Sequence, residues 1–118
     1  MENRLMMKNK IVLVPFPFDD LTGSKVRPAL CLTNSISAYN HVVIAFITSQ
    51  ISKASEISDL PILMTDSDFS QTGLKIDSAI RLHRLVTIPT TFIQRQLGTL
   101  PTTYSPRLET KFKGLFGL

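Results

Sequence analysis

Cysteine, tryptophan and glycine are scarce in this chain of 118 residues, which has one cysteine, no tryptophan and five glycines. A single cysteine excludes an intrachain disulfide and a metal site built from several thiolates, and it fits a reducing cytoplasm. Cys31 stands in the apolar run Ala-Leu-Cys-Leu, which predicts a buried side chain. The alternative is a catalytic thiol, which needs an electropositive and partly exposed place.

Long hydrophobic runs are also absent. No apolar stretch approaches the roughly 20 residues that cross a bilayer, and residues 1–10 carry several charges. We therefore expect neither secretion nor membrane insertion. The length and a hydrophobic content of 43% predict one domain over residues 1–118 with an ordinary core.

Acidic residues become rare toward the end of the chain. The whole sequence has 13 Lys and Arg against 9 Asp and Glu, a net charge of +4. From Ser78 onward, Glu109 is the sole acid beside the bases Arg81, Arg84, Arg95, Arg107, Lys111 and Lys113. This balance favours a polyanionic partner. A solvated basic face that aids solubility is the alternative.

Short β-rich runs alternate with turns over the first two thirds of the chain. Residues 11–14, 29–33 and 41–47 are apolar and contain β-branched side chains, so we expect three strands there, the first two joined as a hairpin. Residues 52–59 favour a short helix or turn, residues 61–64 a short strand and residues 66–73 a loop. Residues 76–88 predict two strands or one long bent strand.

Beyond residue 89 the pattern is typical of helices. Residues 92–97 predict a short amphipathic helical segment, which ends at Gly98. The pattern consists of Phe92, Ile93, Gln96 and Leu97. Ser105 predicts an N-cap and Pro106 a first helical turn. The stripe expected to dock this last helix on the sheet or on a partner subunit comprises Leu108, Phe112, Leu115 and Phe116. The predicted fold is mainly β (α+β), a small, strongly bent antiparallel sheet or barrel with peripheral helices.

Motifs for common enzyme chemistry are missing. The sequence has no phosphate-binding glycine loop, no metal-ligand spacing and no Gly-x-Ser-x-Gly elbow. Its two histidines, His41 and His83, are far apart, and each is more typical of a structural or surface position than of catalysis. Candidate chemistry therefore comes from polar groups at strand ends.

Two of these groups lie in the first half of the chain. Arg27 precedes Pro28, and its planar guanidinium suits a phosphate; an ordinary surface ion pair with Asp19 or Asp20 is the alternative. The segment Thr-Ser-Gln at residues 48–50 provides two hydroxyls and an amide where an apolar strand stops. An ordinary turn that ends a strand explains that segment equally well.

A third group is Arg-Leu-His-Arg at residues 81–84. Alternation along a strand puts Arg81 and His83 on the same face, and histidine adds a group that titrates near neutral pH. A plain basic strand face is the competing interpretation.

These segments together resemble the MazF/PemK toxins. Lys-Ile-Val-Leu-Val-Pro-Phe-Pro-Phe at residues 10–18 precedes an acidic, glycine-containing loop and Arg-Pro-Ala-Leu-Cys-Leu at residues 27–32. The likeness continues with Ala-Phe-Ile-Thr-Ser-Gln at 45–50, Ser-Ala-Ile-Arg-Leu at 78–82, Val-Thr-Ile at 86–88 and Leu-Gly-Thr-Leu at 97–100. It covers nearly the whole chain in the order of the family.

The resemblance implies a cytoplasmic toxin of a bacterial type II toxin-antitoxin system with an SH3-like barrel, usually a homodimer. It implies a metal-independent endoribonuclease of the mRNA interferase type that needs no cofactor. Arg27 and Thr48 match the family's catalytic arginine and threonine. Arg81 and His83 correspond to an arginine and a carboxylate two residues on in some relatives, and here histidine replaces the acid.

The expected reaction is transesterification by the 2′-hydroxyl of single-stranded RNA, leaving a 2′,3′-cyclic phosphate and a 5′-hydroxyl. Arg27 would hold the scissile phosphate, and His83 would take the acid or base step. Thr48 would form a hydrogen bond with a phosphate oxygen or with the attacking hydroxyl, with Ser49 as a helper. Base recognition is expected from loops at 17–25 and 52–59. The side chains expected to bind substrate are Phe18, Asp20, Lys25, Gln50 and Lys53.

The partner expected for the same basic surface is an antitoxin with an acidic, partly disordered segment. Three other interpretations remain open at this point. The same fold could serve as a nucleic-acid-binding module without catalysis, as a toxin that attacks DNA gyrase through Leu115 and Phe116, or as a structural protein.

Overall fold

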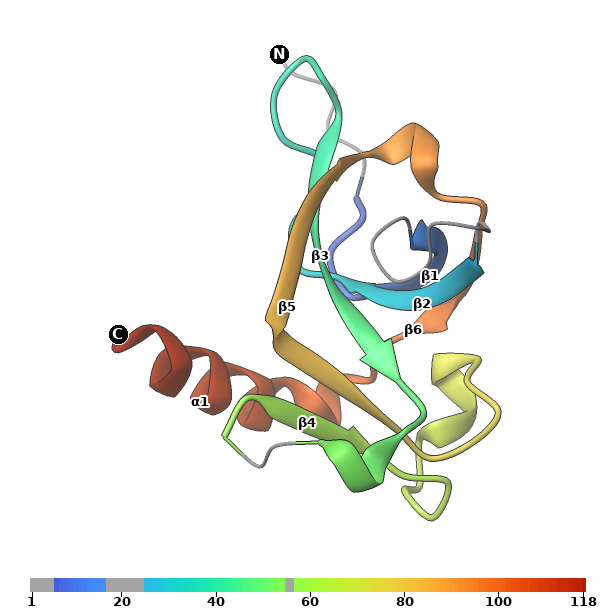
Figure 1. Ribbon diagram of the computed structural model, residues 1–118, viewed down its shortest axis with the longest axis vertical. Helices are drawn as coiled ribbons and strands as arrows, with labels where there is room; N and C mark the ends of the chain where they lie inside the picture. Colours follow the sequence, from blue (N-terminus) through green and yellow to red (C-terminus); the bar gives the residue numbers. More distant parts are fainter. Residues whose placement is uncertain (1–5, 17–24, 55–56) are drawn as a thin grey trace.

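Within the described residues, 6–16, 25–54 and 57–118, the computed structural model has one strongly curled antiparallel sheet of six strands in the order β4-β5-β3-β2-β1-β6 (Figure 1). The strands are β1 (Lys10–Phe16), β2 (Lys25–Cys31), β3 (His41–Thr48), β4 (Asp59–Ile62), β5 (Ser78–Pro89) and β6 (Arg95–Thr99). The one α-helix in these residues is α1 (Ser105–Phe116), and single 3-10 turns are η1 (Ile51–Lys53), η2 (Phe69–Thr72), η3 (Thr90–Phe92) and η4 (Thr102–Tyr104). The expected small barrel of bent antiparallel strands is confirmed as a curled half-barrel.

The first three strands form where the β-branched runs predict them. β1 and β2 pair as the expected antiparallel hairpin, and β2 continues the sheet to β3. These strands are apolar on both faces because the sheet has a core cluster on each side. The first cluster comprises Ile11, Leu30, Ala45, Ile47, Leu60, Ile62, Ile80, Leu82, Leu100 and Tyr104. The second comprises Val12, Val14, Ala29, Cys31, Val42, Ile44, Phe46 and Ile88.

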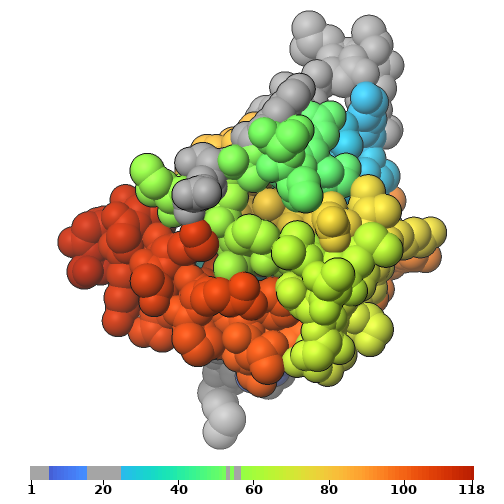
Figure 2. Space-filling model, turned by 90° about the horizontal axis from the view of Figure 1, so that it is seen from below, coloured from blue at the N-terminus to red at the C-terminus, as the bar shows by residue number. Residues whose placement is uncertain are grey.

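The helix α1 covers the first cluster, as its apolar stripe predicts. Leu108, Phe112 and Leu115 pack against that cluster, while Phe116 stays half exposed with its ring 4.8 Å from the ring of Phe112. Figure 2 shows this C-terminal segment in orange and red beside the yellow-green residues that lead into β5. No helix in the described ranges has the length and apolar character to cross a membrane.

The prediction of a helical segment at residues 92–97 is wrong. Only the 3-10 turn η3 forms there, and residues 95–99 are the strand β6, which pairs with β1 at the edge of the sheet. Tertiary pairing overrides the helical spacing because β1 offers a free row of hydrogen-bonding groups. Gly98 is required in β6 since a Cβ there would lie 2.4 Å from the carbonyl oxygen of Gln71 and 2.5 Å from that of Thr72.

Several boundaries also differ from the expectation, and β2 spans Lys25–Cys31 where the sequence predicts residues 29–33. The strand expected at residues 61–64 is β4, which spans Asp59–Ile62. It can include Pro61 because β4 is an edge strand, where the missing N–H of proline is tolerated. The expected short helix at 52–59 is limited to η1. Pro106 lies in the first turn of α1 as predicted, but Ser105 is no N-cap: η4 leads directly into the helix, and no side chain caps it.

Candidate active site

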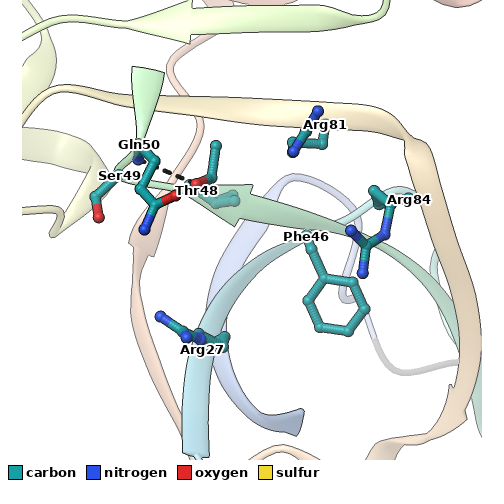
Figure 3. Close-up of a pocket in the computed structure, with 8 residues that line it drawn as sticks. Arg27, Phe46, Thr48, Ser49, Gln50, Arg81 and Arg84 are labelled. Carbon is teal, nitrogen blue, oxygen red and sulfur yellow. Dashed lines mark hydrogen bonds between the residues drawn. The ribbon is translucent and has the colours of Figure 1, made fainter. Parts of the chain in front are cut away.

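A small cavity opens on the sheet where β3 ends (Figure 3). It encloses about 170 Å³. Its walls come from β2, from the end of β3 and the turn that follows, and from β5. The residues that line it are Arg27, Phe46, Ile47, Thr48, Ser49, Gln50, Arg81 and Arg84.

Strand register explains why these side chains meet. Phe46 is opposite Ala29 in the antiparallel pair of β2 and β3. Arg27 lies two residues before Ala29 and Thr48 two residues after Phe46, so all belong to the face of the sheet that carries the second core cluster. Thr48 is opposite Ala79, which puts Arg81 on that face as well. The polar residues thus continue a buried apolar face to its open end.

A bend in β5 brings a second arginine of that strand to the cavity. Ala45 pairs with Leu85 and Ile47 pairs with Ile80, so that the single residue Phe46 faces the whole of residues 81–84. Such an irregularity breaks the strict alternation of faces and increases the local twist. Arg84 therefore lines the cavity together with Arg81, which simple alternation would place on the opposite face.

The charged side chains that line the cavity are all guanidinium groups: Arg27, Arg81 and Arg84. Each carries N–H donors in a planar fork that matches the oxygens of a phosphate. Arg27 is half-buried on a regular strand, so the sheet holds it more firmly than a loop would. The cavity is thus suited to an anion such as a phosphate.

The hydroxyl of Thr48 has a fixed orientation. Its Oγ1 accepts a hydrogen bond from the backbone N–H of Gln50 at 3.0 Å, drawn as the dashed line in Figure 3. With one lone pair engaged in this turn, the hydroxyl hydrogen remains to donate toward a ligand in the cavity. The sequence Thr-Ser-Gln therefore does form an ordinary strand-ending turn, and the turn itself orients the threonine.

A carboxylate that the sequence analysis missed lies beside Arg81. Asp59 on β4 is directly opposite Arg81 on β5, and its side chain is 1% exposed. Asp59 Oδ1 is 3.4 Å from Arg81 Nε and 3.8 Å from His83 Nδ1. The only sequence signal is an acidic residue at the start of the run Asp-Leu-Pro-Ile, where Pro61 hides the strand pattern.

His83 shares the face of Arg81, as alternation predicts, but it does not line the cavity. Its Nδ1 is 2.8 Å from Ser58 Oγ, and its side chain is 36% exposed. It lines an adjoining hollow, which shares Phe46 and Arg84 with the cavity. The imidazole is therefore next to the site, with one nitrogen held by a neighbouring strand.

Of the remaining residues predicted for the site, some line the cavity and others do not. Ser49 and Gln50 line the cavity and are exposed, whereas Lys25 is exposed at the start of β2 and does not. Lys53 lies in η1, and its side chain is outside the described part of the chain. Phe18 and Asp20 lie outside the described residues altogether, together with Asp19, the other acid considered as a partner for Arg27.

Neither a metal centre nor a reactive thiol is evident in the described part of the chain. No group of three or more His, Cys, Asp or Glu side chains there could hold a metal ion. Cys31 is fully buried in the second core cluster, as predicted, and burial raises the pKa of its thiol to about 11. It is therefore protonated at neutral pH and belongs to the core.

Comparison with known proteins bears on the family and the fold. Residues 7–116 match the sequence model of the family described as PemK-like, MazF-like toxin of type II toxin-antitoxin system. No curated protein sequence matches the chain. The fold is similar to that of Mycobacterium tuberculosis toxin MazF-mt6, with a TM-score of 0.72 and 23% identity over 92% of this chain and 97% of that one. It is also similar to a mycobacterial endoribonuclease in complex with its cognate antitoxin, with a TM-score of 0.68 and 15% identity over 95% of each chain.

Proposed function

Because the chain belongs to the PemK-like, MazF-like toxin family of type II toxin-antitoxin systems, we propose that it is an endoribonuclease that cuts single-stranded RNA in the bacterial cytoplasm. The observation that carries the proposal is the convergence of Arg27, Thr48 and Arg81 on one small cavity. A phosphate with splayed neighbours fits such a cavity better than a duplex does, since in-line attack needs a distorted backbone. The relative described as an endoribonuclease supports the same activity.

The reaction needs only groups that RNA, this cavity, the neighbouring His83 and water supply. The 2′-hydroxyl gives its proton to Nε2 of His83 and its oxygen bonds to the adjacent phosphorus, while the bond from phosphorus to O5′ breaks and O5′ takes a proton from water. The hydroxide that remains takes the proton from His83. The products are a 2′,3′-cyclic phosphate and a 5′-hydroxyl. Arg27 and Arg81 stabilise the charge that builds on the phosphate oxygens, an effect of about 3 kcal/mol for one well-placed donor.

Thr48 and Ser49 complete the phosphate contacts. The bond from the Gln50 N–H leaves the Thr48 hydroxyl hydrogen to donate to a non-bridging phosphate oxygen. Ser49 is exposed at the same rim and gives a second donor, and the Gln50 side chain contacts the neighbouring nucleotide. These groups are weaker than guanidinium donors, and their main contribution is geometry.

His83 is the group we assign to proton transfer. Ser58 holds its Nδ1, so Nε2 is the nitrogen that can accept the proton of the 2′-hydroxyl. The hollow beside His83 shares Phe46 and Arg84 with the cavity, so we expect the imidazole to lie beside a nucleoside attached to the bound phosphate. Replacing His83 with Gln is expected to slow cleavage and to leave RNA binding nearly unchanged.

The donor set favours a mechanism without metal. Three guanidinium groups line the cavity and repel a divalent cation. The described residues also have no cluster of three or more metal-ligating side chains. We therefore propose that cleavage proceeds in EDTA.

The test uses the purified protein and a long single-stranded RNA in EDTA, with fragment ends mapped. Arg27→Ala is compared with Arg95→Ala, a matched change at an exposed arginine of β6 away from the cavity. We expect discrete cuts with cyclic phosphate ends from the wild type and Arg95→Ala, and at least about 100-fold slower cleavage by Arg27→Ala. Intact RNA with folded wild-type protein, or equal cutting by Arg27→Ala, would contradict the proposal.

An antitoxin and a second copy of the chain are the proposed protein partners. The structural relative in complex with its cognate antitoxin supports the first. An acidic, partly disordered segment would compete with RNA for the arginines of the cavity. Co-expression with the protein encoded beside this gene should yield a complex that no longer cuts RNA, and light scattering of the free protein should give twice the mass of one chain. RNA cleavage by the complex at the rate of the free protein would contradict the antitoxin assignment. The mass of a single chain would contradict the homodimer.

A further inference from the structure

The carboxylate of Asp59 is buried next to a site made of positive charges. It lies on β4, an edge strand, and is 1% exposed. An ionised carboxylate this deeply buried is costly unless other groups compensate it. Its Oδ1 lies between two side chains of β5, 3.4 Å from Arg81 Nε and 3.8 Å from His83 Nδ1.

We propose that Asp59 is a positioning residue for the reaction, acting through Arg81 and His83. This inference rests on the proposed ribonuclease function. In this view β4, which does not line the cavity, holds two side chains of β5 in place: Arg81, which binds the phosphate, and His83, which accepts the proton.

The first contact orients the guanidinium. An arginine side chain has many rotamers, and a carboxylate at Nε restricts both its position and the plane of its fork. Asp59 Oδ1 lies on the Nε side of the guanidinium in an ion pair at 3.4 Å that lacks hydrogen-bond geometry. The terminal Nη groups are therefore the donors available to the cavity that Arg81 lines. Figure 3 shows Arg81 on the β5 side of that cavity, across from Arg27. The phosphate would thus be held between donors from β2 and β5.

The second contact orients the imidazole. Ser58 Oγ is 2.8 Å from His83 Nδ1, and Asp59 Oδ1 approaches the same nitrogen. A carboxylate there favours the tautomer with a proton on Nδ1, which leaves Nε2 as an acceptor. The backbone fixes this register because the Leu82 N–H donates to the Ser58 carbonyl oxygen at 2.8 Å.

The charge of Asp59 also predicts a signature that a purely structural residue lacks. Asp59→Asn keeps the shape of the side chain but removes one negative charge beside the cationic cavity. RNA should then bind as tightly as before or more tightly, while the misaligned Arg81 and His83 slow the chemical step. We expect kcat to fall about 10- to 100-fold with an unchanged or lower KM.

The experiment measures kcat and KM for Asp59→Asn, Arg81→Ala and the double variant on a short RNA that the wild type cuts once. Asp77→Asn is the matched control, since Asp77 accepts a hydrogen bond from the Met64 N–H away from the cavity. If Asp59 acts through Arg81 and His83, Asp59→Asn should cost much less in the Arg81→Ala background than alone. Fully additive losses, a rise in KM at constant kcat, or wild-type kcat in Asp59→Asn would each overturn the inference.

A measurement on the wild type covers the case in which Asp59→Asn does not fold. NMR should detect a slowly exchanging Nε–H of Arg81, assigned by its loss in Arg81→Lys, and a proton on Nδ1 of His83. Rapid exchange at Arg81, or His83 without a proton on Nδ1, would overturn the inference. A wild-type protein that cuts RNA while these results fail would leave the proposed function intact, whereas a wild type without cleavage defeats the proposed function itself.

Discussion

Replacing Thr48 with valine separates the contribution of one hydroxyl to stability from its contribution to cleavage. Valine has nearly the same shape and is equally suited to the end of a strand, so the backbone should not change. The substitution removes the acceptor of the Gln50 N–H and the donor proposed for the phosphate. Both losses follow from the same oxygen atom, but they are measured separately.

The expected loss in transition-state stabilisation exceeds the expected loss in folding stability by about 2 kcal/mol. The bond from the Gln50 N–H is at 3.0 Å in an exposed turn, so its loss should lower the free energy of unfolding by about 1 kcal/mol or less. For a chain of this length that is a fall in Tm of about 4 °C. Loss of one donor to the transition state costs about 3 kcal/mol, which is a decrease in kcat of about 100-fold.

Thr33 provides the matched control for this prediction. Its Oγ1 accepts a hydrogen bond from the Val43 N–H at 3.2 Å, and it lies away from the cavity. Thr33→Val should lower Tm by a similar amount and cleave RNA at the wild-type rate, while Thr48→Ser should stay within about tenfold of the wild type because it keeps the hydroxyl. Cleavage assays and thermal melts on the same samples provide the comparison. If Thr48→Val cuts RNA as fast as Thr33→Val, the reasoning about this hydroxyl is refuted.

Further predictions concern the packing of two glycines, the titration of a buried tyrosine and the third arginine of the cavity. Gly98→Ala should lower the free energy of unfolding by about 3 kcal/mol because the new Cβ meets the backbone of η2. Gly114→Ala should raise the free energy of unfolding by about 1 kcal/mol, since Gly114 lies in α1 with open space around it. Equal melting temperatures of the two variants would contradict this prediction. Burial and the hydrogen bond to Asp66 raise the pKa of Tyr104 to about 12, so the folded state keeps the phenol proton longer than the unfolded chain does. The resulting stabilisation is complete below about pH 10 and should be lost between pH 10 and 12, and Tyr104→Phe should flatten that part of the curve of stability against pH. Arg84→Gln should weaken RNA binding and reduce its salt slope by about 1, measured by fluorescence anisotropy, while an unchanged slope would show that Arg84 does not contact phosphate.

Much of the fold could be predicted because the local and the global preferences agree. The apolar runs at β1, β2 and β3 are buried on both faces, so their composition alone identifies them as strands. The stripe of Leu108, Phe112 and Leu115 likewise matches the face of α1 that packs on the first cluster. Where pairing at an edge decides the structure, as in β6, the local helical spacing gives the wrong answer.

The candidate site was predictable only in part, for the same reason. Arg27 and Thr48 stand next to apolar runs, so a position beside buried strand residues could be inferred from the sequence, although β2 begins before Arg27. Arg84 could not be inferred, because the irregular pairing around Phe46 breaks the alternation of faces. Asp59 could not be inferred either, since its role depends on the pairing of β4 with β5, which brings Asp59 opposite Arg81, 22 positions further along the sequence. Contacts of this kind are set by tertiary structure.

The central claim is that this cavity promotes attack by the 2′-hydroxyl of RNA on its own phosphate. The most direct test uses two oligonucleotides that carry one cleavage site and differ by a single 2′-deoxy substitution at the nucleotide before the scissile bond. In EDTA, the all-RNA substrate should be cut to a 2′,3′-cyclic phosphate and a 5′-hydroxyl, and the deoxy substrate should stay intact at that bond while binding with similar affinity. Cleavage of the deoxy substrate at the same bond would contradict the account.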